Sequence, residues 1–109
     1  MGVAHHSACV AWLEEARIAW LRDHGASYRE LEASGLLMPV VDLHIRYRRS
    51  LRFDDVADLW TTVAAPGPTR LAFTTRLEVA GVMALDGVVT VAAVDRSGRP
   101  VRLPAHLLP

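Results

Sequence analysis

The chain has 109 residues, of which 51% are hydrophobic and 22% charged, and residues 1–109 are expected to form one domain. Its formal net charge is zero, so the composition predicts no nucleic-acid partner. No apolar run approaches the roughly 20 residues of a membrane span. The one cysteine excludes an internal disulfide and favours a cytoplasmic location.

A long helix is predicted near the start of the chain. Trp12, Ala16 and Trp20 are spaced by four residues, which indicates one buried stripe on a helix. Ser7 is the expected N-cap, and Gly25 is the expected C-terminal stop.

A second, short helix is predicted directly after the first. The segment Ser27-Tyr28-Arg29-Glu30 has the form of a capping box, and Gly35 is placed to end the helix. The chain therefore begins with two helices in succession.

From Leu36 onward the apolar residues recur with a period of two, which is typical of strands. The first strand is expected to have one buried face and one solvent-exposed face. The last strand is expected to be covered on both faces, with either a bulge or a close approach of another element at Gly87. Trp60 is expected in the core. The predicted strands are 41–48, 56–64, 71–79 and 82–94, with turns at 65–68, near Gly81 and at 95–98. Helices followed by four strands indicate an α+β fold, with the long helix packed against an antiparallel sheet.

A candidate catalytic feature lies where the chain enters the first helix. Gly2, His5 and His6 stand just before or at the expected helix start. Backbone N–H groups and the positive end of the helix dipole favour a carbonyl oxygen that gains negative charge. The ordinary alternative is that the imidazoles cap the helix or face solvent. No metal site is expected, because adjacent histidines point apart and no third ligand is evident.

Two further groups of charged residues are candidates for chemistry. Glu14 and Glu15 are possible general bases, although only one of two consecutive helix residues can point inward and both can equally form a solvated face. Glu14 can also pair with Arg17 on the outer face of the helix. Three arginines can donate to phosphate groups of a ligand, or simply occupy a solvent-exposed strand face: Arg46, Arg48 and Arg49.

The order and spacing of several segments resemble the hotdog-fold acyl-CoA thioesterases, in the branch named after 4-hydroxybenzoyl-CoA thioesterase. The resemblance covers nearly the whole chain. It is carried by Met1–Ser7, Trp12–Arg17, Ser27–Glu32, Pro39–Val41, Arg52–Asp55, Val94–Asp95, Arg99–Pro100 and Leu103–Pro104. It implies a sheet wrapped around the long helix, a homodimer or homotetramer built by joining sheets edge to edge, and active sites at the dimer interface.

The family motif also implies residue roles. The backbone N–H of His6 matches the donor that polarises the thioester carbonyl. An Asp three positions before the glycine that matches Gly2 acts as nucleophile or base, and its position falls before residue 1, as does the family's first strand. Ala8 stands where Asn is usual, and Cys9 where Tyr is usual. Three explanations are open: an internal Met recorded as the start, a truncated product, or a member that uses another base or none.

The function expected from these observations is hydrolysis of a thioester between an acyl group and coenzyme A or a carrier protein, with no cofactor apart from the coenzyme A of the substrate. Because the family's Asp is missing from this sequence, turnover is expected to be slow. The alternative is a non-catalytic hotdog module that binds acyl groups or serves in assembly.

Overall fold

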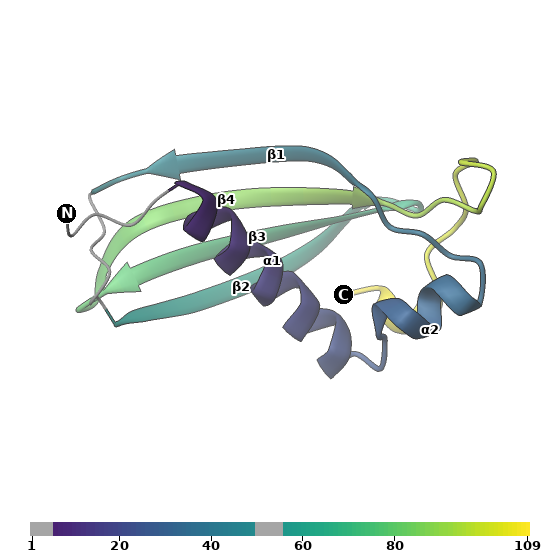
Figure 1. Ribbon diagram of the computed structural model, residues 1–109, viewed down its shortest axis with the longest axis horizontal. Helices are drawn as coiled ribbons and strands as arrows, with labels where there is room; N and C mark the ends of the chain where they lie inside the picture. Colours follow the sequence, from purple (N-terminus) through teal and green to yellow (C-terminus); the bar gives the residue numbers. More distant parts are fainter. Residues whose placement is uncertain (1–5, 50–55) are drawn as a thin grey trace.

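The computed structural model describes residues 6–49 and 56–109, with side chains from residue 10 onward. Gly2, His5, the side chains of 6–9 and the segment Arg52–Asp55 lie outside the described residues. Helix α1 lies obliquely across one face of a four-stranded sheet, and α2 follows beyond its end (Figure 1). The elements are α1 (His6–Asp23), α2 (Tyr28–Ala33), β1 (Val40–Tyr47), β2 (Ala57–Gly67), β3 (Arg70–Val79), β4 (Val82–Ala92) and the short 3₁₀ helix η1 (Ala105–Leu107).

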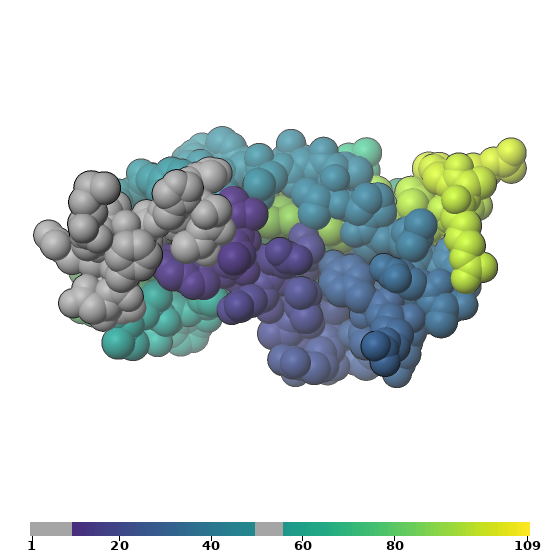
Figure 2. Space-filling view, viewed as in Figure 1, coloured from purple at the N-terminus to yellow at the C-terminus, as the bar shows by residue number. Residues whose placement is uncertain are grey.

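The described strands form one antiparallel sheet in the order β1-β4-β3-β2. The predicted α+β architecture, a long helix packed against an antiparallel sheet, is therefore confirmed. The order puts β4 and β3 in the centre and leaves β1 and β2 as edge strands. Figure 2 shows α1 crossing the covered face between β1 above and β2 below.

Local signals explain the ends of both helices. Gly25 has a φ of 76°, and the N–H of Ala26 donates to the carbonyl of Leu21 over 2.9 Å, so the predicted stop of α1 is confirmed. The predicted cap at Ser7 is wrong, because the helix already begins at His6 and Ser7 lies inside it. At α2, the Ser27 hydroxyl accepts from the N–H of Glu30 over 3.2 Å, as the capping box predicts.

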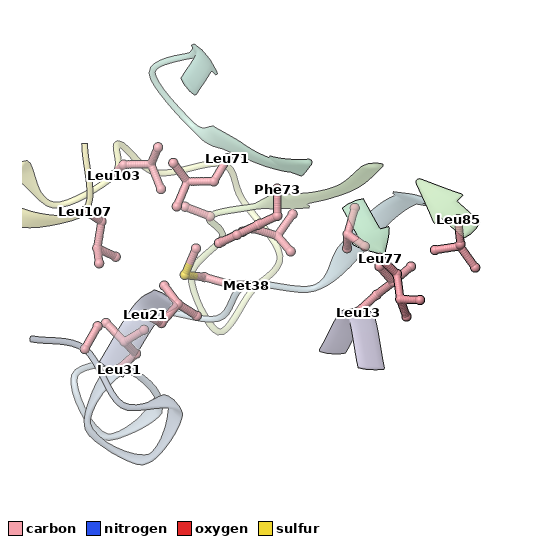
Figure 3. Packing of buried hydrophobic residues seen from close by; sticks show 14 of the residues in the cluster. Leu13, Leu21, Leu31, Met38, Leu71, Phe73, Leu77, Leu85, Leu103 and Leu107 are labelled. Atoms are coloured by element: carbon pink, nitrogen blue, oxygen red, sulfur yellow. The ribbon is translucent and has the colours of Figure 1, made fainter. Parts of the chain in front are cut away.

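The core lies between α1 and the covered face of the central strands. Leu13 and Leu21 of α1 are turned towards Phe73 and Leu77 of β3 and their buried neighbours (Figure 3). These β3 residues alternate with exposed ones, because successive strand residues point to opposite faces.

Among the described glycines, Gly87 of β4 has the least room for a side chain, because α1 packs closely on the sheet there. A Cβ there would lie 3.0 Å from Leu13 Cδ1 and 3.3 Å from the carbonyl oxygen of His44. The expected close approach is confirmed, whereas the expected bulge is not. Gly87 pairs in regular register with Ile45 and Thr75.

Exposure of the edge strands departs from the sequence expectations. The predicted buried face of β1 is open in the single chain, with Val41 46%, Leu43 44% and Tyr47 50% exposed. Trp60 of β2, expected in the core, is 55% exposed. The second face of β4 is only half-buried, as at Val88, rather than covered. In each case α1 covers one face of the central strands and does not reach these side chains.

The turn after β2 also differs from its prediction. The strand continues through Pro66 and Gly67, and the turn is formed by Pro68 and Thr69. A register shift between Ala64 and Gly67 accommodates the proline. This is possible because β2 is an edge strand, where a residue without an N–H need not break the ladder.

Candidate active site

The first turn of α1 presents backbone donors. The helix begins at His6, and the first four N–H groups of a helix have no partner within it. The first turn contains no acidic residue that would offset the positive end of the dipole. The main chain at His6 therefore suits a polarised carbonyl oxygen, whereas Gly2, His5 and the His6 side chain lie outside the described residues.

A pocket of about 240 Å³ opens between α1 and β1, and we call it the α1–β1 pocket. Val10, its residue nearest the helix start, lies about one turn after His6. Apolar side chains form most of the walls, and Glu14 and Arg17 are the charged residues. The lining is Val10, Leu13, Glu14, Arg17, Val40, Leu43 and Val89.

The two candidate carboxylates face different surroundings. Glu14 lines the α1–β1 pocket, while Glu15 lines a wider groove of about 600 Å³ between α1 and β2. Both residues are exposed. The separation follows from the helix, in which consecutive side chains point in directions about 100° apart. Only Glu14 therefore shares a pocket with the residues next to the helix start.

Arg17 is a site residue that the sequence reasoning missed. Its Nε is buried without a hydrogen-bond partner, and the only other such side-chain atom among the described residues is the hydroxyl oxygen of Tyr28. The Arg17 guanidinium carbon lies 5.9 Å from the centre of the Tyr28 ring. The expected pairing of Arg17 with Glu14 is wrong, because the ion pairs found within the described residues join Arg48 to Asp86 and Arg76 to Glu78. The signal was available: Val10, Leu13, Glu14 and Arg17 have the i, i+3, i+4, i+7 spacing of an inward stripe.

The three candidate phosphate ligands lie at the end of β1. Arg46 is in register with Asp86, on the face of the sheet turned away from α1. Arg48 Nε donates to Asp86 Oδ1 over 2.9 Å, and the N–H of Arg49 donates to the carbonyl of Ala84. Figure 1 shows this end of β1 and the first turn of α1 at the same end of the molecule. Arg46 does not share a pocket with Glu14.

Within the described residues, no group of three or more His, Cys, Asp or Glu side chains is placed to hold a metal ion. None of the helices in that part of the chain is long and apolar enough to cross a membrane.

Comparison with known proteins identifies relatives that are named as thioesterases. The profile of the Thioesterase-like superfamily matches residues 1–109. The acyl-CoA thioester hydrolase YbgC of Escherichia coli O6:H1 is 30% identical over 109 residues, covering 99% of this chain and 78% of the relative. The putative acyl-CoA thioesterase YneP of Bacillus subtilis is 35% identical over 63 residues, and that match spans 58% of this chain but only 46% of the relative.

Among solved structures, the DHNA-CoA thioesterase from Staphylococcus aureus superposes with a TM-score of 0.85 at 27% identity. The match covers 94% of this chain and 70% of that one. The predicted hotdog fold is confirmed by this likeness.

Proposed function

Because the chain belongs to the Thioesterase-like superfamily, we propose that it hydrolyses the thioester bond between an acyl group and coenzyme A. The supporting observation is the position of the α1–β1 pocket, an apolar space with one carboxylate on its lining, next to the first turn of α1. An apolar pocket with few polar groups suits an acyl chain, and the donors of the helix start suit its carbonyl.

In this mechanism a water molecule attacks the thioester carbonyl carbon, and the oxygen gains negative charge. The N–H of His6 donates to that oxygen, and the carbon–sulfur bond then breaks to release the acid and the thiol. One hydrogen-bond donor of this kind typically raises kcat by a factor of about 10²–10³. The residue's main chain carries this role, so His6→Ala should retain most of it.

Glu14 is the described carboxylate best placed to activate the water. Its Cα is eight residues, or about 12 Å along the axis, beyond that of His6. Side chains on a helix point back towards its N-terminus, which shortens this gap, and a general base can act through one intervening water. Gly2 and His5 belong to the same proposed site but lie outside the described residues, and the position of the family's Asp falls before residue 1. Glu15, in the other groove, is not needed in this arrangement.

The phosphates of coenzyme A are assigned to the end of β1, where Arg49 and the exposed Arg48 are donors. Arg48 already pairs with Asp86, so a phosphate would share or replace that partner. Arg46, on the outer face, is the weakest of the three candidates. No cofactor is needed beyond the coenzyme A of the substrate.

We further propose a homodimer or homotetramer. The exposed apolar side chains of β1, together with the unpaired backbone that an edge strand presents, support pairing with a second copy, which would bring an interface next to the α1–β1 pocket.

One sheet and one buried cluster support treating residues 1–109 as a single domain. The single cysteine supports a cytoplasmic location, the zero net charge argues against nucleic acid, and the 4-hydroxybenzoyl branch stays a prediction.

A thiol-release assay on short and medium acyl-CoA substrates tests this function. We expect hydrolysis above the uncatalysed rate and a loss of about 10²–10⁴ in kcat for Glu14→Gln, the usual contribution of a general base. Glu15→Gln is the comparison, and a loss there instead would contradict the choice of Glu14. Free coenzyme A should raise the Tm, and replacing Arg48 and Arg49 together should abolish that rise. Acyl-CoA binding without thiol release would favour the non-catalytic module.

A further inference from the structure

The face of the sheet turned away from α1, which we call the back face, is open in the single chain. Among the described strands, the side chains that project from it are exposed or half-buried, whereas those beneath α1, such as Phe73 and Leu77, are buried. Its largest apolar side chain, that of Trp60, is 55% exposed. We propose that a second copy of this chain packs on the back face, sheet against sheet. This contact does not depend on the proposed hydrolysis, and together with the proposed pairing at β1 it builds the homotetramer.

The middle of the back face carries no charge. Residues in register on neighbouring antiparallel strands project from the same face, so the pairing of β2, β3 and β4 defines two rows of three side chains there. All six are small or β-branched, and half of them are apolar, which lets two sheets pack closely. The solvated face of an antiparallel sheet is ordinarily polar, whereas the centre of an interface between proteins is poor in charges. The middle row is Thr62, Thr74 and Val88, and the alanine row is Ala64, Ala72 and Thr90.

The large side chains of the back face form a third row, which can meet small side chains of a second copy. A two-fold axis across the strands, along the middle row, turns this large row over the alanine row of the other copy. Trp60 then faces Ala64 and Arg76 faces Ala72, so two sheets about 10 Å apart interdigitate along the contact. The same axis crosses β1 at His44, so pairing of two β1 edges about that residue closes the assembly. The large row is Trp60, Arg76, Asp86 and Arg46.

The same alignment brings opposite charges together on the β1 side of the back face. Arg46 of each copy faces Asp42 of the other, because these two residues of β1 lie in register with the large row and the alanine row. Within one copy they are four residues apart on a strand, which is roughly 14 Å, so they cannot pair with each other. Neither makes an ion pair within the part of the chain that the structure describes. The second copy therefore offers each of them a partner of opposite charge.

The back face is large enough for a specific interface. Its strands have 8, 11, 10 and 11 residues. With a rise of about 3.4 Å per residue and about 4.8 Å between neighbouring strands, the face measures roughly 600 Å². Two such faces bury about 1,200 Å², and a specific contact between proteins needs about 1,000 Å² or more.

Light scattering of variants at micromolar concentration tests the contact. The wild type should have the mass of four 12.0 kDa chains. Ala72→Arg puts a charge into the uncharged middle of the contact, which should raise its Kd at least about 100-fold and leave pairs joined at β1. Leu43→Arg, which blocks the β1 edge, should leave pairs joined through the back face. The two changes together should give single chains, and Ala33→Arg, at an exposed position of α2, should leave four.

A charge exchange tests the alignment of the two copies. It is made in the Leu43→Arg background, where the back face is the remaining contact. Adding Asp42→Arg puts two arginines opposite each other and should separate the pair. Adding Arg46→Asp as well restores opposite charges and should restore the pair, a rescue that a loss of folding would not allow.

Single chains in Leu43→Arg, a mass that Ala72→Arg leaves unchanged, or a charge exchange that does not restore the pair would overturn the proposal. A wild-type pair that Ala72→Arg separates and Leu43→Arg does not would support the back-face contact and refute the pairing at β1. Thiol release from acyl-CoA, measured on the same proteins, reports on the proposed hydrolysis separately.

Discussion

Replacing Gly87 by alanine tests how closely α1 packs on the sheet. The added Cβ would lie 3.0 Å from Leu13 Cδ1, 3.3 Å from the carbonyl oxygen of His44 and 3.5 Å from Ile45 Cγ1. The leucine methyl can move by a few tenths of an ångström. The carbonyl cannot move as easily, because β1 is held in register against β4.

The size of the change in stability follows from two opposing effects. Overpacking a core by one carbon typically costs about 1–3 kcal/mol, whereas replacing glycine by alanine gains about 0.4–1 kcal/mol through the unfolded chain. We therefore expect Gly87→Ala to lower the free energy of unfolding by about 1–2 kcal/mol. At about 4–8 °C per kcal/mol for a domain of about this size, the Tm should fall by several degrees.

Urea unfolding followed by tryptophan fluorescence at one fixed protein concentration measures the change. Gly67→Ala is the matched control, because nothing lies within 4 Å of its added Cβ and its backbone is not in the left-handed region. It should be neutral or slightly stabilising. A Leu13→Ala background removes the nearest obstacle, so Gly87→Ala should cost less there, by an interaction energy of about 0.5 kcal/mol or more. A Gly87→Ala protein as stable as the wild type would refute the close approach. Equal losses of stability from Gly87→Ala in the wild-type and Leu13→Ala backgrounds would show that the backbone of β1 is the obstacle.

Three further outcomes are expected. Ser27→Ala should lower the free energy of unfolding by about 0.5–2 kcal/mol, because the hydroxyl caps α2, whereas Ser27→Gly should lower it by only a few tenths; equal losses would argue against the cap. Hydrogen bonds from the Ser97 hydroxyl and from the N–H groups of Arg99 and Ser97 lower the pKa of Asp95 below its ordinary value of 3.8. Because folding lowers the pKa of Asp95, its ionised carboxylate stabilises the folded protein above pH 3.8, and this stabilisation is lost as pH falls through the folded-state pKa. The wild type should therefore unfold at a higher urea concentration than Asp95→Asn above that pH, and this difference should shrink in acid. Light scattering at micromolar concentration should give a mass above the 12.0 kDa of one chain, and Leu43→Arg on the exposed edge of β1 should lower it; a wild-type monomer would exclude the proposed assembly.

The candidate site was only partly predictable from the sequence. The sequence predicted a helix start near His6, although with its cap at Ser7, and indicated that only one of Glu14 and Glu15 can point inward. The structure puts the two carboxylates in different grooves. Arg17 was expected on the outer face, paired with Glu14. In the structure its Nε is buried, and its guanidinium carbon lies 5.9 Å from the ring of Tyr28, which belongs to another helix.

What the sequence by itself determined are the elements whose signals are local. The Ser27 cap, the stop at Gly25 and the alternation through β3 each involve residues a few positions apart, and each is present in the fold. Tertiary structure alone decided which strands are central and which face α1 covers. The order β1-β4-β3-β2 leaves Leu43 and Trp60 exposed, although their own strands alternate like the buried β3. The physical reason is that alternation specifies two faces for a strand, whereas burial requires a neighbour, and that neighbour comes from a distant part of the chain.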